Sequence, residues 1–248
     1  MSPQGKIRAD LALTERGLAP SRTRAQALIL AGKVFSGEQR IHKAGQLISP
    51  EQPLEVRGPD HPWVSRGGVK LTHGLDHFKI LPKGMTALDI GASTGGFTDV
   101  LLTGGAKKVY AVDVGRGQLD WKLRNDERVV VLEKTNARYL TKDKIPDPLN
   151  LITCDASFIS LKTILPASLE LVSPGAWLVA LIKPQFEAGK DKVGKKGVVR
   201  DSKTRAEVCE DISQWMASRS GWTVLGMVES PITGPEGNVE YLMGALYG

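Results

Sequence analysis

The chain has 248 residues, 41% of them hydrophobic and 24% charged, which is typical of a folded globular protein and sufficient for one α/β domain with a smaller addition. The apolar run at residues 177–182 is too short to span a bilayer, and residues 1–20 lack the apolar stretch of a secretory signal, so we expect a cytoplasmic protein without a membrane span. Of the formal net charge of +6, +5 falls in residues 1–70, where 11 Lys and Arg face 6 Asp and Glu, which predicts a polyanion-binding end.

Residues 1–58 predict a small α+β domain. A short helix is expected over 7–16, and a second helix is expected to begin at Ser21, a residue type that caps helix N-termini well, and to end at Gly32. Short segments at 34–35, 40–41, 47–48 and 54–56 predict a small hairpin-rich sheet. The second helix would bury Ala25, Leu28 and Ile29 and leave a basic rim of Arg22, Arg24 and Lys33.

Residues 59–68 are rich in Pro and Gly and predict a linker, where Trp63 is expected to pack the two domains together. From 69 to 248 strands and helices alternate, which predicts an α/β fold with a doubly wound, mostly parallel sheet. Cys154 and Cys209 fall in a predicted strand and helix, so neither a disulfide nor a structural metal is expected. The predicted strands are Thr86–Ile90, Lys108–Asp113, Val129–Leu132, Leu149–Asp155, Trp177–Lys183, Thr223–Glu229 and Val239–Leu246, the last one antiparallel.

The strongest motif is a glycine-rich turn at 91–96, between a predicted strand and a helix, where the backbone can approach a ligand closely. Position 93 is Ser, so the turn lacks the Gly-x-Gly-x-x-Gly pattern of dinucleotide sites, whereas Asp-x-Gly-x-x-x-Gly suits S-adenosylmethionine. The carboxylate of Asp113 would meet ribose hydroxyls and Asn136 would lie near adenine, unless the turn is purely structural. The residues predicted to bind this cofactor are Asp89, Gly91, Ser93, Gly95, Gly96, Phe97, Asp113, Asn136, Ala137 and Asp155.

Four ionisable residues fall where they could converge at the carboxyl edge of the sheet. Asp155 and Lys183 end two strands, Lys70 lies near the start of the helix that leads into the sheet, and Glu240 begins the last strand. They could form a structural ion-pair network. Alternatively, they could catalyse the transfer of a methyl group to a hydroxyl group, a reaction that needs a base. Lys183 would be that base, beside the positive charges of Lys70 and the cofactor sulfonium, while Asp155 and Glu240 orient the lysines.

Three further segments indicate a function less specifically than the glycine turn and the four ionisable residues. Residues 155–158 lack the two prolines typical of enzymes that methylate base nitrogens, which favours a hydroxyl substrate, while Phe158 could stack on a ring or lie in the core. Residues 190–200 carry a net charge of +4 and predict either a mobile lid that grips phosphates or a solvated charged run. His73 and His77 lack the Glu of a His-Glu-x-x-His zinc motif, so no metal is expected there.

Together these residues resemble the TlyA family, often labelled hemolysin A, which comprises ribosomal RNA 2′-O-methyltransferases related to FtsJ, and the resemblance covers the whole chain. Residues 8–34 are similar to the RNA-binding module first seen in ribosomal protein S-four, and the segment from Trp63 to Leu71 is similar to the interdomain segment of the family. His61 stands where the linker motif of the family begins with Arg, so linker switching carried by that arginine is not implied here.

The resemblance implies an S-four-like RNA-binding domain at 1–58, a linker at 59–68 and a Rossmann-like class I methyltransferase domain with a seven-stranded sheet at 69–248. It also implies that Lys70, Asp155, Lys183 and Glu240 are a catalytic tetrad, that S-adenosylmethionine is the cofactor, and that ribosomal RNA, free or in a ribosomal subunit, is the substrate. A base methyltransferase, an RNA-binding protein with an inactive methyltransferase fold, and a membrane-acting hemolysin are the alternatives. The residues expected to bind RNA are Arg8, Arg22, Arg24, Lys33, Arg66, Lys195 and Lys196.

Overall fold

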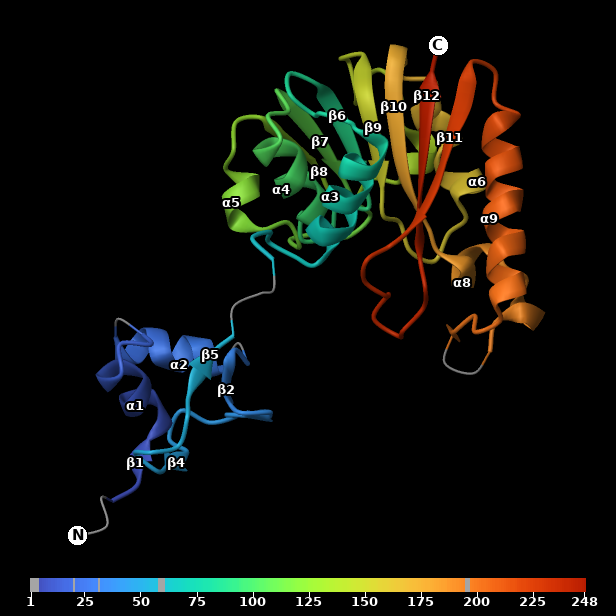
Figure 1. Cartoon of the computed structure of the whole chain (residues 1–248). Helices are drawn as coiled ribbons and strands as arrows, with labels where there is room; N and C mark the ends of the chain where they lie inside the picture. The colour runs from blue at the N-terminus through green and yellow to red at the C-terminus, as the bar shows by residue number, and fades with distance from the viewer. Residues whose placement is uncertain (1–4, 20, 31, 58–60, 195–196) are drawn as a thin grey trace. The chain divides into compact units, whose positions relative to one another are not determined.

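The computed structural model describes residues 5–19, 21–30, 32–57, 61–194 and 197–248, and the chain divides into two compact units, Met1–Pro62 and Trp63–Gly248 (Figure 1). The division falls inside the predicted linker 59–68, and helix α3 (Gly67–Phe78) already begins within it. Trp63, predicted to join the two domains, packs against the hydrophobic core of the larger unit, and the missing side chain of Gly68 leaves room for its indole.

The smaller unit combines two helices with short strands, as predicted. One expectation was wrong: residues 7–8 form a strand instead of the first turn of a helix, because Ile7 and Arg8 pair antiparallel with Ile48 and Leu47. This pairing forms a two-stranded sheet that is separate from the other strands of the unit. The elements are β1 (Ile7–Arg8), α1 (Ala9–Glu15), α2 (Arg22–Leu30), β2 (Val34–Ser36), β3 (Gln39–Arg40), β4 (Leu47–Ile48) and β5 (Glu55–Val56).

The smaller unit has its own hydrophobic core. Ala25, Leu28 and Ile29 of α2 are buried, as their helical spacing predicted, and they share a cluster with Leu13 of α1 and Ile48 of β4. The last residue of α2, Leu30, lies outside this core and is exposed.

The larger unit is built on a seven-stranded sheet with the order β11-β12-β10-β9-β6-β7-β8. The run from β10 to β8 is parallel, and β12 is antiparallel to both of its neighbours, which confirms the predicted fold class. The strands are β6 (Thr86–Ile90), β7 (Lys108–Val112), β8 (Val129–Leu132), β9 (Leu149–Cys154), β10 (Val172–Ile182), β11 (Trp222–Glu229) and β12 (Tyr241–Tyr247).

Five strands have bounds that differ from the prediction, and the starts of β10 and β12 differ most. β10 begins at Val172, ahead of the predicted start at Trp177, because a shift in register lets Val172 pair with Leu149 despite the intervening Pro and Gly. β12 begins at Tyr241, so Glu240 immediately precedes the strand that it was expected to open.

Helices cover both faces of the sheet, with α3, α4 and α5 on one side and α6 and α9 on the other (Figure 1). Ala87 of β6 shares a hydrophobic cluster with Leu71 of α3 and Val100 of α4, whereas its neighbour Leu88 shares the opposite cluster with Ile212 of α9. Alternate side chains of a central strand thus anchor opposite layers. The other helices are α4 (Gly96–Thr103), α5 (Trp121–Arg124), α6 (Leu161–Ile164), α7 (Pro166–Leu169), α8 (Pro184–Glu187), α9 (Ser202–Ala217), η1 (Ala137–Tyr139) and η2 (Lys190–Lys192).

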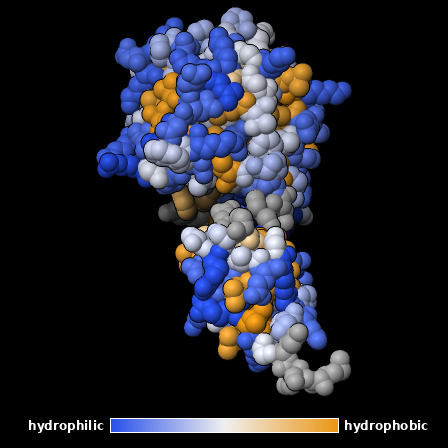
Figure 2. Space-filling model, turned by 90° about the vertical axis from the view of Figure 1, so that its left-hand side faces the viewer, coloured by the Kyte–Doolittle hydropathy of each residue, from blue (hydrophilic) through white to orange (hydrophobic). Residues whose placement is uncertain are grey.

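The surface of the larger unit is mainly hydrophilic on the face seen in Figure 2, where hydrophobic residues form separate patches. Within the described residues, none of the helices combines the length and the apolar composition that a membrane crossing requires.

Candidate active site

The glycine turn lies at the carboxyl end of β6, where α4 begins at Gly96. Gly91 (φ +79°) and Gly95 (φ +97°) adopt left-handed backbone conformations that favour glycine. A Cβ on Gly91 would lie 2.8 Å from the carbonyl oxygen of Asp155, and a Cβ on Gly95 would overlap the side chain of Leu123. The turn therefore packs closely against its neighbours and still contributes to the wall of a cavity.

This cavity has a volume of about 670 Å³. Its wall is formed by α3, the glycine turn, the ends of β9 and β10, and the segment before β12, so elements far apart in the sequence meet there. The predicted site residues on its wall are Arg66, Lys70, Gly91, Ser93, Gly96, Phe97, Asp155, Lys183 and Glu240.

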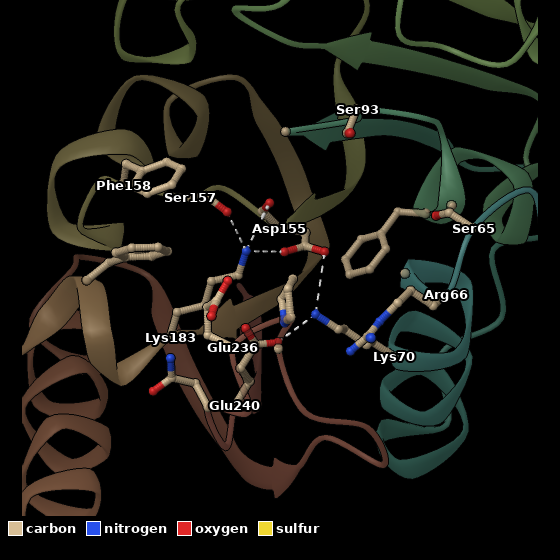
Figure 3. A pocket seen from close by; sticks show the side chains of 18 of the residues that line it. Ser65, Arg66, Lys70, Ser93, Asp155, Ser157, Phe158, Lys183, Glu236 and Glu240 are labelled. Atoms are coloured by element: carbon tan, nitrogen blue, oxygen red, sulfur yellow. Dashed lines mark hydrogen bonds and ion pairs between the residues drawn. The ribbon is translucent and has the colours of Figure 1, made fainter. Parts of the chain in front are cut away.

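Lys70, Asp155, Lys183 and Glu240 converge in this cavity, as Figure 3 shows. Nζ of Lys70 lies 2.5 Å from Oε2 of Glu240 and 4.0 Å from Oδ2 of Asp155, while Nζ of Lys183 lies 2.5 Å from Oδ1 of Asp155. Lys70, Lys183 and Glu240 are 5%, 7% and 1% exposed. Asp155 bridges the two lysines, so every buried charge of the four has an opposite charge beside it.

Lys183 is held by further contacts with the loop after β9. Its Nζ donates hydrogen bonds to Oγ of Ser157 at 2.9 Å and to the carbonyl oxygen of Asp155 at 3.5 Å. Because the lysine immediately follows a buried strand, these partners fix the direction of its amino group.

Glu240 is enclosed by the segment that leads to it. The backbone amide of Ser230 donates to its carbonyl oxygen, and a Cβ on Gly234 would lie 2.7 Å from its Oε1. Arg66 reaches this segment by donating to the carbonyl oxygen of Thr233. The guanidinium of Arg66, predicted to bind RNA, therefore already has one acceptor within the larger unit.

A second cavity, about 680 Å³, shares Gly91, Ser93 and Asp155 with the first, and Asp113, Asn136 and Ala137 also line it. The carboxylate of Asp113 accepts hydrogen bonds from the backbone amides of Ser93 at 2.8 Å and Gly115 at 2.7 Å. Asn136 caps η1 by accepting from the amide of Arg138 at 3.1 Å. These contacts hold both polar side chains at the edge where a ribose and an adenine were expected.

Asp89 lies behind the glycine turn and, like Gly95, lines neither cavity, so the structure does not bring it together with the predicted cofactor ligands on the cavity walls. It is fully buried and accepts hydrogen bonds from the hydroxyls of Thr98 at 2.7 Å and Thr153 at 3.3 Å. Burial, with a smaller contribution from the charge of Asp155, raises the pKa of Asp89 to about 7. Its visible role is to join α4 to β9 beneath the turn.

Besides Phe97, two aromatic residues, Phe158 and Phe186, line the first cavity. Phe158 is 89% exposed, so the interpretation of this residue as a core aromatic is wrong, and its ring lies 4.9 Å from the ring of Phe186, centre to centre. Phe186 and Gln185 line the cavity as well, and the sequence reasoning missed both. Their position directly after Lys183 at a strand end was the available signal.

The predicted RNA-binding residues of the smaller unit are partly engaged within it. Arg8 and Arg22 both contact the buried carboxylate of Asp10, at 3.0 and 3.2 Å, yet their side chains are 47% and 54% exposed. Lys33 is half-buried after α2. Lys195, Lys196 and the side chain of Arg24 lie outside the described residues.

The basic segment 190–200, predicted as either a mobile lid or a solvated charged run, contains the short helix η2. Lys192 is paired with Glu207 of α9 at 2.7 Å, and the amide side chain of the buried Asn238 bonds to the backbone of Gly197 and Val199. Arg205 of α9 also donates to the carbonyl oxygen of Arg200 at 2.7 Å, so the described part of this segment is attached to the rest of the larger unit.

Cys154 and Cys209 are both free thiols, and burial raises the pKa of Cys154 to about 12 and that of Cys209 to about 11. No group of three or more His, Cys, Asp or Glu placed to hold a metal occurs among the described residues.

Comparisons with known proteins cover both units. The FtsJ-like methyltransferase family model matches residues 63–247. The 16S/23S rRNA (cytidine-2′-O)-methyltransferase TlyA of Mycobacterium tuberculosis is 48% identical, over 96% of this chain and 89% of that protein. Hemolysin A of Brachyspira hyodysenteriae is 40% identical, over 95% and 98%.

Among solved structures, a protein titled "Putative hemolysin" from Streptococcus thermophilus superimposes with a TM-score of 0.75 and 42% identity, over 98% of this chain and 89% of that one. Matches of this extent confirm that the protein is a methyltransferase. The chain belongs to the FtsJ-like methyltransferases and, among these, to the family that includes TlyA and hemolysin A.

Proposed function

We propose that this protein transfers the methyl group of S-adenosylmethionine to the 2′-hydroxyl of a ribose in ribosomal RNA. The observation that carries the proposal is the convergence of Lys70, Asp155, Lys183 and Glu240 in one cavity beside the glycine turn. A relative with 48% identity is named for cytidine 2′-O-methylation of 16S and 23S rRNA, which supports the same class of substrate.

The cavities suit the cofactor. The glycine turn brings the backbone to the cavity wall without a side chain, and the carboxylate of Asp113, fixed by two backbone amides, can accept hydrogen bonds from ribose hydroxyls. Gly91 and Ser93 would lie beside the cofactor, while Asn136 and Ala137 would lie near its adenine. When bound, S-adenosylmethionine supplies a methyl group already activated by the sulfonium charge.

The four charged residues have different roles in the transfer. Lys183, as a neutral amine, would take the proton of the 2′-hydroxyl at Nζ and so make the hydroxyl oxygen nucleophilic, and the contacts to Asp155 and Ser157 aim that nitrogen. Asp155 also faces Lys70, whose own charge is balanced by Glu240. The buried set would fix the base beside the hydroxyl and the methyl donor, and such positioning is the main requirement for this transfer.

RNA would be held at two places. The half-exposed guanidiniums of Arg8 and Arg22 give the smaller unit a surface for phosphates. At the catalytic edge, Arg66 lies on the cavity wall, and the exposed ring of Phe158 offers a surface on which a base can stack. The absence of prolines in residues 155–158 favours ribose over base nitrogen, and the complete tetrad favours an enzyme over an inactive RNA-binding fold.

The decisive experiment maps the methyl group. Ribosomal RNA incubated with the protein and isotopically labelled S-adenosylmethionine should gain label on a ribose 2′-oxygen, located by nuclease digestion and mass spectrometry. Label on a base would contradict the ribose assignment. Calorimetry tests the cofactor independently, and an absence of binding even with RNA present would contradict the enzyme assignment itself.

A further inference from the structure

Glu187 lies outside both cavities, yet its carboxylate joins the two segments that carry the catalytic residues. It ends α8, the short helix directly after Lys183. One carboxylate oxygen accepts a hydrogen bond from Oγ of Ser160 at 2.6 Å, and the other accepts from the backbone amide of Leu161 at 2.8 Å. These partners end the loop 155–160, between β9 and α6, and begin α6.

The loop 155–160 places three groups at the cavities: the carboxylate of Asp155, the hydroxyl of Ser157 and the ring of Phe158. Its backbone is strained at Phe158, where φ is +65°, a left-handed conformation that is costly for a large side chain. Such a conformation persists only where surrounding contacts hold it.

The loop and the segment 183–187 touch at three places. Two of these contacts, Lys183 with Asp155 and Ser157, and Phe186 with Phe158, lie on the cavity wall, where substrate must enter. The third is the pair of hydrogen bonds made by Glu187, away from the cavity. It is therefore the contact that can hold the loop while the other two are occupied with substrate.

Burial raises the pKa of Glu187, although its bonds to Ser160 and Leu161 favour the ionised form. Both carboxylate oxygens of Glu187 thus serve as hydrogen-bond acceptors, whereas burial disfavours the negative charge of the group. A neutral amide of the same shape keeps the acceptor for the Leu161 amide and can still bond the Ser160 hydroxyl.

We propose that Glu187 is a positioning residue for methyl transfer: by holding the loop 155–160 against α8, it keeps Asp155 and Ser157 in register with Nζ of Lys183. The inference rests on the proposed function of the tetrad.

The test compares Glu187→Ala and Glu187→Gln with Asp211→Ala as a matched control. Asp211 also ties α6 to α9, through Lys162 at 2.7 Å, but it is 62% exposed and lines neither cavity. At saturating RNA and S-adenosylmethionine, Glu187→Ala should lower kcat about tenfold or more, because small misplacements of reacting groups are costly, while the other two variants stay within about twofold. Glu187→Asp, whose carboxylate is retracted by one methylene, replaces the Ala variant if that variant does not fold.

Hydrogen exchange supplies a readout that does not depend on RNA. Amides in residues 156–163 should exchange faster in Glu187→Ala than in the wild type, Glu187→Gln or Asp211→Ala. An unchanged kcat in Glu187→Ala, an equal loss in Glu187→Gln, or unchanged exchange in residues 156–163 would overturn the proposal. If the wild type transfers no methyl group to RNA, the proposed function fails, whereas the exchange rates still decide whether Glu187 holds the loop.

Discussion

Two fully buried aspartates, Asp10 of the smaller unit and Asp89 of the larger unit, are held in opposite ways. Asp10 of the smaller unit contacts Arg8 and Arg22, and the guanidinium of Arg8 holds the pKa of Asp10 well below its usual range. Asp89 of the larger unit accepts hydrogen bonds from two threonine hydroxyls, and burial raises its pKa to about 7. Charged donors replace the lost hydration of a carboxylate, whereas neutral hydroxyls do so only in part.

The difference separates two uses of buried charge. In the smaller unit, Asp10 is a fixed anchor that holds two arginines in place while about half of each side chain stays in solvent. At the catalytic edge of the larger unit, by contrast, the charges of Lys70, Lys183 and Glu240 are themselves buried and face a cavity. The first arrangement suits recognition of phosphates, and the second suits proton transfer.

The largest expected effect comes from removing the base of the buried network. Lys183→Ala should lower kcat by about a thousandfold while changing S-adenosylmethionine affinity by less than about threefold, because Lys183 acts on the hydroxyl proton. Single-turnover methyl transfer and calorimetry measure the two quantities. Lys183→Arg keeps the positive charge but cannot accept a proton, so it should be as inactive, and an active arginine variant would show that charge alone suffices.

Asp89 should make the stability of the larger unit depend on pH. Its pKa of about 7 in the folded protein exceeds the ordinary value of 3.8, so folding is accompanied by proton uptake between these pH values. Stability should therefore fall as pH rises from about 4 to 7, by on the order of 2–4 kcal/mol, and level off above that. Asp89→Asn should flatten this dependence, whereas Asp143→Asn, which changes an exposed acid, should retain it.

Urea unfolding followed by tryptophan fluorescence measures this effect, because all five tryptophans belong to the larger unit. If stability depends on pH in the same way in the wild type and in Asp89→Asn, the pKa of Asp89 is not raised, and the contrast drawn with Asp10 is wrong.

A side chain at the glycine turn should weaken cofactor binding as well as the fold. Gly91→Ala places a Cβ 2.8 Å from the carbonyl oxygen of Asp155 and strains a left-handed backbone, so we expect about a tenfold loss of S-adenosylmethionine affinity and about 1–3 kcal/mol of stability. Gly84 (φ +74°) is the matched control, since its Cβ would meet nothing within 4 Å. Gly84→Ala should lower stability but leave S-adenosylmethionine affinity unchanged. An equal loss of affinity in both variants would exclude a specific role of the glycine turn in cofactor binding.

The smallest expected effect lies at the surface of the smaller unit. Arg22→Ala should weaken RNA binding a few-fold and reduce the slope of log affinity against log salt by about one, because one phosphate contact is lost. Arg57, held by Glu38 and Glu55 and stacked on Phe35, is the control, and Arg57→Ala should change the slope less. Equal slopes for wild type and Arg22→Ala, measured by fluorescence anisotropy across salt concentrations, would contradict a contact by this arginine.

The sequence-based predictions were confirmed where a strong local pattern supported them. The bounds of β6 and β8 agreed with their apolar runs, and the buried face of α2 followed its helical spacing. Residues 7–8 were misassigned because their partners, Leu47 and Ile48, lie far along the chain and nothing local indicates the pairing. Asp89 was placed among the cofactor ligands because its position in the motif does not reveal which face of β6 it occupies.

By itself, the sequence determined the order of the strands along the chain, the glycine turn and the identity of the four charged residues, because each is a local pattern or part of a family motif. Only the tertiary structure decided that Asp155 stands between Lys70 and Lys183, that Asp89 lies behind the turn, and that Glu187 braces the loop 155–160. The physical reason is that distances and burial at a sheet edge depend on strands brought together from distant parts of the chain.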